Sequence, residues 1–245
     1  YGRNEWLTIA VAGALLSLAA ILMGWWILTV LLVLLTIALL LFFRDPERRP
    51  PVQRNIMVAP ADGRVSSVHT LDHFEPLGGP ATCIRIFLSV LDVHINRSPC
   101  HGQVSRVVHK PGDHLNALNP TSAEVNESNL IVLLHPIRRH PVAAVRQVAG
   151  LLARTIACGV REGDILQRGQ RIGMIKLGST TELYIPADLQ PTPTVEVGQK
   201  VKGGVTVLAS YVSKDNPTVA PTIAANAAAV AMTERPPAPT PEAAV

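Results

Sequence analysis

Two apolar runs that are typical of strands meet at a Gly-Ser corner in the stretch Arg168-Gly-Gln-Arg-Ile-Gly-Met-Ile-Lys-Leu-Gly-Ser-Thr-Thr-Glu-Leu-Tyr-Ile-Pro186. The runs are Met174–Leu177 and Leu183–Ile185, and the corner is Gly178-Ser179. A serine hydroxyl can attack the carbonyl of the preceding residue when the fold strains that bond, and glycine leaves the approach open because it has no side chain. The same pattern also fits an ordinary tight turn between two strands. The corner therefore predicts either a hairpin turn or a self-cleaving peptide bond.

The corner is flanked by two segments that share one pattern of glycines and aliphatic residues. The two segments are Val160-x-x-Gly163-x-x-Leu166-x-x-Gly169 and Val195-x-x-Gly198-x-x-Val201-x-x-Gly204. This spacing resembles the hairpins of biotinyl and lipoyl domains, in which glycines form the turns and aliphatic side chains fill a small β-sandwich. The repeat predicts a stiff β unit around the Gly-Ser bond, which a strained peptide bond requires.

Much of the remaining chain consists of short apolar runs separated by Gly, Pro and Asp. The runs are Val65–Val68, Cys83–Val90, Val104–Val108, Leu130–Leu134 and Val142–Val148. Such spacing predicts a mainly β domain of the α+β class, and Gly150–Ala157 is the best candidate for a helix. We expect this domain to cover residues 55–215. It would lie between a basic, Pro-rich linker, residues 44–54, and a disordered Ala/Pro-rich tail, residues 216–245.

The N-terminal segment has the composition of a membrane anchor. The chain has 245 residues, of which 48% are apolar, and no charged residue occurs between Leu7 and Phe43. This run is longer than the apolar core of a signal peptide, which is about 7 to 15 residues. A single helix through it would be about 55 Å long, against about 30 Å of hydrocarbon. Two helices joined at Gly24-Trp25-Trp26 fit better, so residues 1–43 are expected to form a hairpin that passes through or dips into the membrane; one tilted helix is the alternative.

The charge pattern supports this interpretation. The net charge is +4, and five arginines border the apolar segment: Arg3, Arg44, Arg48, Arg49 and Arg54. They predict contacts with anionic lipid heads, and the positive-inside rule places both ends of the hairpin, and the β domain, on the cytoplasmic side. No basic run is interleaved with aromatic residues, so nucleic acid is not an expected partner.

Cysteine and histidine content argues against disulfides and metals. Cys83, Cys100 and Cys158 lack any Cys-x-x-Cys spacing and are expected to be reduced, buried thiols. His135 and His140 have no third ligand nearby in the sequence, so no metal site is expected.

Two clusters away from the corner hold side chains capable of acid–base chemistry. Asp62 lies at an Asp-Gly turn, a position that also suits a purely structural aspartate. If Asp92–Asn96 is extended, alternation puts Asp92, His94 and Asn96 on one face. A histidine there could shuttle protons near neutral pH, although a structural histidine satisfied by hydrogen bonds fits the local sequence as well.

Several of these motifs, in this order, resemble those of phosphatidylserine decarboxylases. Leu177-Gly-Ser-Thr180 is similar to the family's cleavage site, which is cut between Gly and Ser. Phe42-Phe-Arg-Asp-Pro46 resembles the membrane exit of the short, membrane-bound form, and the resemblance extends to about Ser210. It implies a β chain of residues 1–178 and an α chain of residues 179–245. Ser179 would become a pyruvoyl group, so that no cofactor has to be supplied from outside.

The resemblance also implies roles for individual residues. Asp62 corresponds to the family's Ala-Asp-Gly aspartate, which acts in self-cleavage, and His94 corresponds to the first of two motif histidines. Arg97 occupies the position of the second histidine of the long form. We therefore expect His94 to carry much of the acid–base work and Arg97 to hold a phosphate or carboxylate. The other expected substrate-binding residues are Asn96, Asn126, Glu127, Gln147 and Thr180.

The implied function is decarboxylation of phosphatidylserine, or of an archaeal ether analogue, to phosphatidylethanolamine. The substrate amine would form a Schiff base with the pyruvoyl ketone, which serves as the electron sink. The implied partners are a phospholipid of the cell membrane, the two chains of one precursor, and a second copy in a homodimer. Two other interpretations stay open: a non-enzymatic membrane adaptor built on a lipoyl-like sandwich, and an uncleaved lipid-binding scaffold.

Overall fold

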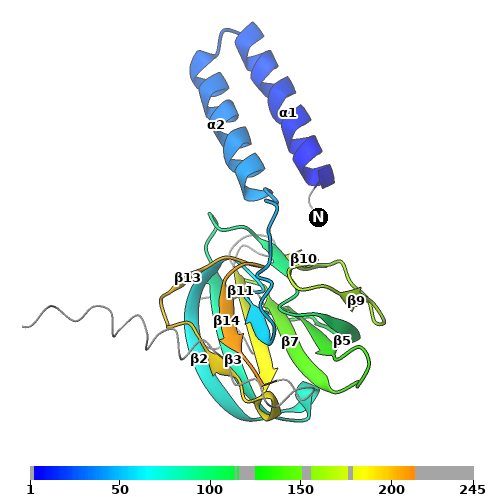
Figure 1. Ribbon diagram of the computed structural model, residues 1–245. Helices are drawn as coiled ribbons and strands as arrows, with labels where there is room; N and C mark the ends of the chain where they lie inside the picture. The colour runs from blue at the N-terminus through cyan, green and yellow to red at the C-terminus, as the bar shows by residue number, and fades with distance from the viewer. Residues whose placement is uncertain (1–2, 114, 116–124, 151–155, 176–178, 213–245) are drawn as a thin grey trace, which may run out of the picture.

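The computed structural model of the chain describes residues 3–113, 115, 125–150, 156–175 and 179–212, with side chains from residue 6 onwards. Two N-terminal helices stand above a β domain (Figure 1). They are α1, Arg3–Leu22, and α2, Trp26–Phe42, and we call the pair the helical hairpin. Gly24 between them has a φ of 73°, a left-handed conformation that glycine adopts without strain. The prediction of two helices joined at Gly24–Trp26 is thus confirmed.

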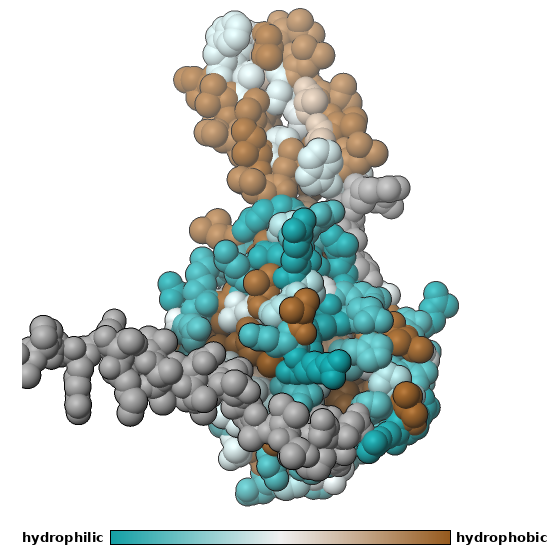
Figure 2. All heavy atoms as spheres, in the orientation of Figure 1, coloured by the Kyte–Doolittle hydropathy of each residue, from teal (hydrophilic) through white to brown (hydrophobic). Residues whose placement is uncertain are grey.

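The helical hairpin exposes most of its large apolar side chains. Figure 2 shows it as a mainly brown column above the largely teal surface of the β domain. Leu22 and Ile27, near the tip, are 78% and 81% exposed. Exposed apolar surface this extensive is typical of an interaction site. Among the described residues, however, no helix combines the length and apolar content needed to cross a bilayer.

The β domain is dominated by one curled antiparallel sheet of eight strands, in the order β13-β2-β3-β11-β7-β6-β5-β9 (Figure 1). Two three-stranded sheets, β1-β14-β12 and β4-β10-β8, complete it. The strands are β1 Ile56–Val58, β2 Gly63–Phe74, β3 Gly79–Leu88, β4 Ile95–Arg97, β5 Gly102–Lys110, β6 Ser128–Leu134, β7 Pro141–Val148, β8 Ile156–Cys158, β9 Ile165–Leu166, β10 Arg171–Ile175, β11 Ser179–Pro186, β12 Thr192–Pro193, β13 Lys200–Val201 and β14 Val207–Ser210. Two short 3-10 helices, Glu75–Leu77 and Ala187–Leu189, lie between strands.

The apolar runs of the sequence correspond to these strands. All five runs named above lie wholly or mainly in β2, β3, β5, β6 and β7, so the prediction of a mainly β domain is confirmed. The expected helix Gly150–Ala157 falls mostly outside the described residues, and its last two residues, Ile156 and Ala157, belong to β8 instead. Cys83, Cys100 and Cys158 are free thiols, but Cys158 is exposed and not buried as expected.

The glycine repeat is reproduced in local structure. Gly163, Gly169, Gly198 and Gly204 all have positive φ, between 75° and 94°. Gly163 donates its N–H to a carbonyl of β5, the strand beside the edge strand β9. Gly198 donates its N–H to a carbonyl of β2, the strand beside the other edge strand, β13. The two segments thus carry β9 and β13, which form opposite edges of one sheet. The repeat is real, but the expected lipoyl-like sandwich is not confirmed by this topology.

β11 is the central element of the sheet. All eight of its residues are buried, and it pairs with β3 on one side and β7 on the other. Leu183 and Ile185 point into the main core, whereas Tyr184 packs in a smaller cluster on the opposite face. Every second residue of β11 therefore faces the core, and Ser179 and Thr181 share that face with Leu183.

Candidate active site

Ser179 begins β11, opposite Leu88 of β3. It is fully buried, and its Oγ has no hydrogen-bond partner among the described residues. Leaving a buried hydroxyl unpaired costs about 1–3 kcal/mol, so such groups are uncommon and are candidates for a reactive role. Gly178, the other half of the expected cleavage site, lies outside the described residues.

His94 lies beside the strand that leads to Ser179. Its backbone carbonyl accepts a hydrogen bond from Ile175 N at 3.2 Å, so it neighbours the end of β10. The imidazole is fully buried, and the Phe42 ring at the end of α2 lies 4.5 Å from it, centroid to centroid. The helical hairpin thus ends in direct contact with a candidate catalytic residue.

The protonation of His94 follows from these surroundings. Nδ1 lies 2.9 Å from the Asp92 carbonyl, which can only accept, so Nδ1 carries the proton and Nε2 the lone pair. Burial lowers the pKa of His94 to about 4, and the bond to Asp92 offsets only part of this effect. The ring is therefore a neutral base at physiological pH.

A chain of buried amide side chains lies next to Ser179 on the core side of the sheet. Asn129 Nδ2 donates to Gln147 Oε1 at 2.9 Å, and Gln147 Nε2 donates to Asn96 Oδ1 at 2.8 Å. Asn96 Nδ2 then donates to Thr181 Oγ1 at 3.1 Å, two residues from Ser179. The structure therefore brings Asn96 and Gln147 together, and it fixes β4 against β7 and β11 at the start of β11.

Asp62 is held from two directions. Its Oδ1 accepts the N–H of Gly203 at 2.7 Å, and its Oδ2 accepts a hydrogen bond from Arg48 at 2.9 Å. The Arg48 and Asp62 side chains are only 13% and 14% exposed. Arg48 was expected at lipid heads, so its ion pair with a catalytic candidate is a result that the sequence did not predict.

The linker that carries Arg48 is docked along the β domain. Asp45 accepts a hydrogen bond from Arg97 at 3.0 Å and forms an ion pair with Arg171 at 2.6 Å, and Arg97 also donates to Pro46 O. Arg44 Nη2 donates to Leu91 O at 2.6 Å, in the loop that leads to His94. The Arg97 guanidinium thus contacts a carboxylate of the chain itself.

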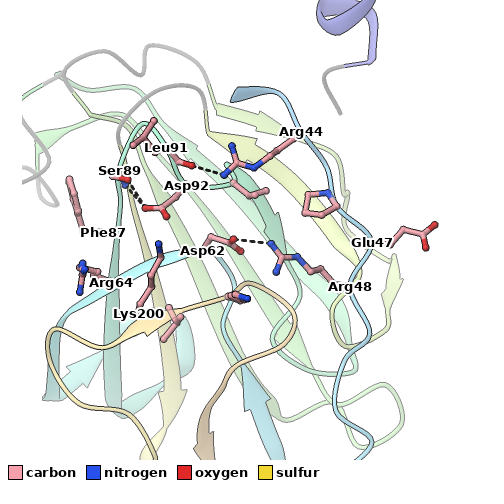
Figure 3. A pocket seen from close by; sticks show the side chains of 14 residues that line it. Arg44, Glu47, Arg48, Asp62, Arg64, Phe87, Ser89, Leu91, Asp92 and Lys200 are labelled. Atoms are coloured by element: carbon pink, nitrogen blue, oxygen red, sulfur yellow. Dashed lines mark hydrogen bonds and ion pairs between the residues drawn. The ribbon is translucent and has the colours of Figure 1, made fainter. Parts of the chain in front are cut away.

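A pocket of about 600 Å³ opens where the linker leaves α2 (Figure 3). Asp92 and Val93, which precede His94, form part of its wall, together with Asp62. Its charged lining consists of five cations and three carboxylates: Arg44, Arg48, Arg64, Lys200, Lys202, Glu47, Asp62 and Asp92. The excess of positive charge favours an anionic ligand.

A known protein family matches most of this chain. The family model described as phosphatidylserine decarboxylase matches residues 35–209. The chain belongs to the phosphatidylserine decarboxylase family.

Several relatives named phosphatidylserine decarboxylase proenzyme extend the match. The protein from Gluconacetobacter diazotrophicus is 46% identical over 171 residues, which are 69% of this chain and 74% of that protein. The protein from Carboxydothermus hydrogenoformans is 41% identical over 212 residues, or 85% of this chain and 94% of that protein. The resemblance stated from the sequence motifs is confirmed, and membership of the decarboxylase family favours an enzyme over a membrane adaptor.

Three further residues were expected at the site of this decarboxylase family member: Thr180, Asn126 and Glu127. Thr180 is buried and follows Ser179 in β11, opposite Phe87 and Val148. Asn126 is buried as well, and its Nδ2 donates to Leu115 O and Ala149 O, both at 2.8 Å. Glu127 is partly buried, with a carboxylate oxygen 3.8 Å from His109 Nε2.

The sequence reasoning missed a buried charge cluster on the opposite face of β11. Glu182 is fully buried and bonds Arg85 at 2.7 Å, Arg146 at 2.5 Å and the Tyr184 hydroxyl at 2.6 Å. Burial would raise the pKa of Glu182, but Arg146, with Tyr184 and Arg85, holds it below its usual value. The sequence did contain a signal for this cluster, because Glu182 is the one charged residue in the otherwise apolar and uncharged stretch that forms β11. This cluster joins β3, β11 and β7.

Among the described residues, no group of three His, Cys, Asp or Glu side chains is arranged to hold a metal ion. His135 and His140, considered above as a ligand pair, have stacked rings with centroids 5.3 Å apart.

Proposed function

We propose that the chain is a self-processing phosphatidylserine decarboxylase that divides between Gly178 and Ser179. The observation that carries this proposal is the buried Ser179 Oγ, which has no hydrogen-bond partner among the described residues at the start of a central strand. Family membership supports the same reaction, because the relatives are named as proenzymes. The residues present fit a pyruvoyl group made from Ser179, since a dry, enclosed position protects a reactive ketone from water.

Self-cleavage would use the side chains around Ser179. The Oγ attacks the Gly178 carbonyl, and the peptide bond is replaced by an ester. A base then removes the Ser179 α-proton, and the ester leaves as the carboxylate that ends the β chain. Neutral His94, with its lone pair on Nε2, suits the role of base, and Asp62 is the second candidate for proton transfer. Hydrolysis of the resulting dehydroalanine releases ammonia and leaves the ketone.

In turnover, the chain's own residues would bind and orient the lipid. The pyruvoyl ketone supplies the electron sink for the departing CO₂. The buried amides of Asn96 and Gln147, close to Thr181, can orient polar groups of the substrate, and His94 can hold or return the proton at the carbon that loses CO₂. Arg97 would bind a substrate carboxylate or phosphate only by exchanging its present partner, Asp45.

We also propose that the helical hairpin inserts into the membrane with the β domain on the cytoplasmic side. The exposed apolar side chains of the hairpin and the basic linker support this. Because Phe42 contacts His94, the acyl chains could stay in the bilayer while the headgroup reaches the site. The homodimer stays a prediction, and both diacyl and ether lipids stay candidate substrates.

Intact-mass spectrometry of the protein purified from membranes tests the proposal. We expect two species divided at Gly178/Ser179, and the smaller one should lack a free amino terminus and gain the mass of two hydrogen atoms after borohydride reduction. The Ser179→Ala variant is the control and should remain a single chain. A wild-type protein that stays whole during prolonged incubation would refute the mechanism and leave a lipid-binding scaffold.

A further inference from the structure

The pocket at the foot of α2 contains cations that no carboxylate of the described residues neutralises. Of its three carboxylates, Asp62 is paired with Arg48, and Asp92 Oδ2 accepts hydrogen bonds from Ser89 N at 2.9 Å and Ser89 Oγ at 2.7 Å. Glu47 points away from the pocket in Figure 3. The acidic side chains of the pocket are therefore either occupied or directed elsewhere.

Of the other four cations, Arg44 donates to two backbone carbonyls, those of Leu41 and Leu91. The remaining three are Arg64, Lys200 and Lys202. Within the described part of the chain, none of the three forms an ion pair with a carboxylate at 4.0 Å or less. Arg64 and Lys200 are directly opposite each other in the antiparallel pair β2–β13. Like charges placed opposite each other destabilise a sheet. A bound anion would convert this repulsion into attraction.

The position of these three cations relates them to the cleavage site. Arg64 is opposite Phe87 in β3, and Phe87 is opposite Thr180 in β11. Two strand spacings of about 4.8 Å each put the Arg64 backbone about 10 Å from that of Thr180. Thr180 directly follows Ser179, but its side chain and that of Arg64 lie on the face of the sheet opposite to the Ser179 side chain. The headgroup would therefore bend around the first residue of β11, and an extended arginine side chain with the short phosphoserine unit of a lipid can together span this distance.

We propose that Arg64, Lys200 and Lys202 bind the phosphodiester of the lipid headgroup while the serine part lies toward Ser179 and His94. The inference rests on the proposed function, because it identifies where the same substrate is held. Arg64 Nη1 donates to Gly198 O at 3.1 Å, which fixes the guanidinium at the pocket wall. A phosphodiester keeps its negative charge throughout the physiological pH range, and arginine and lysine are its usual ligands in proteins. Arg44, a residue of the pocket lining, lies two residues after the helical hairpin, near which lipid headgroups would lie.

Direct binding to the uncleaved Ser179→Ala protein in detergent tests the site without turnover. The probes are glycerophosphoserine, inorganic phosphate and free serine, titrated calorimetrically. We expect glycerophosphoserine to bind more tightly than free serine. The Arg64→Gln variant should weaken it about tenfold or more, as is usual for the loss of one charge-assisted bond. Arg64→Gln with Lys200→Gln should weaken it further.

Arg161→Gln is the matched control, because Arg161 is exposed next to β9, the opposite edge strand of the sheet. It should change the binding less than twofold. Equal weakening in Arg161→Gln and Arg64→Gln would overturn the site in favour of a general charge effect, and unchanged binding in Arg64→Gln would overturn it outright. Vesicles containing phosphatidylserine should displace inorganic phosphate. Phosphate that resists displacement would overturn the assignment to a lipid.

Processing of the Ser179-containing chain is measured separately on denaturing gels. A chain that binds glycerophosphoserine through Arg64 but never divides would keep the phosphate site and refute the proposed function. A chain that divides and decarboxylates, with binding indifferent to Arg64 and Lys200, would refute the phosphate site alone.

Discussion

The buried, neutral state of His94 makes the stability of the protein depend on pH in a defined way. The pKa of His94 is lowered from 6.5 to about 4, chiefly by burial. At 1.36 kcal/mol per pKa unit, the difference corresponds to about 3 kcal/mol favouring the neutral ring in the folded state. The unfolded chain takes up a proton near pH 6.5, whereas the folded chain does so only near pH 4. The free energy of unfolding therefore falls as the pH decreases from 6.5 to 4, and His94 adds no pH dependence above this window.

Urea unfolding of the Ser179→Ala protein in detergent, at pH 7.5 and 4.5, measures this contribution. We expect His94 to account for about 2–3 kcal/mol of the stability lost between the two values. His94→Gln should remove this part of the loss. His69→Gln, which changes an exposed histidine on β2, should not.

Replacing Phe42, whose ring lies against His94, is a second way to change the pKa of that histidine. Phe42 is 6% exposed and packs on the His94 ring. Phe42→Ala should admit water, raise the pKa of His94 by about one unit and reduce the pH-dependent loss accordingly. It will also lower stability at neutral pH through the cavity it leaves, so the pH slope is the informative quantity. If His94→Gln left the slope of the parent protein unchanged, the argument for a neutral buried base would be wrong.

Three further changes test other parts of the structure. Arg48→Gln should slow self-cleavage about tenfold or more by releasing Asp62, whereas Arg49→Gln, at an exposed neighbour, should not; a gel time course distinguishes them, and equal rates would contradict a positioning role. Glu182→Gln should lower the free energy of unfolding by about 3 kcal/mol because it leaves two arginines without their buried partner. Exposed Glu196→Gln should change it by less than about 0.5 kcal/mol, as urea titration would show. Removal of the helical hairpin should abolish flotation with liposomes, and a truncated protein that still floats would assign membrane binding to the β domain.

Local pattern was sufficient to predict much of the fold. Alternating apolar runs and glycine punctuation predicted the strands, and Gly24 marked the break between the helices because a left-handed turn suits glycine. The motif order indicated the family and the candidate residues Asp62 and His94. These features depend on residues that are close in sequence.

Features that depend on sheet order could not be predicted in the same way. Asn96 and Gln147 are 51 residues apart, and only the pairing of β4 with β10 beside β7 and β11 brings them within 2.8 Å. Arg85 and Glu182 are 97 residues apart and meet because β3 and β11 are neighbours in register. For the same reason, the composition of the linker indicated only a boundary between the anchor and the β domain, whereas in the structure Arg97 and Arg171 hold its Asp45 against the β domain.

The central place of β11 has a consequence for a divided molecule. After cleavage at Gly178/Ser179, β11, β13 and β14 would belong to one polypeptide, while their partners β3, β7, β2 and β1 would belong to the other. The two polypeptides would then be interwoven strand by strand, so that neither could leave without dismantling the sheet. Folding before the cut is a first-order event within one chain, but reassembly after denaturation would require two chains to meet. The mature protein would thus be kept intact by its slow opening rate, and its 1:1 stoichiometry would be inherited from the precursor.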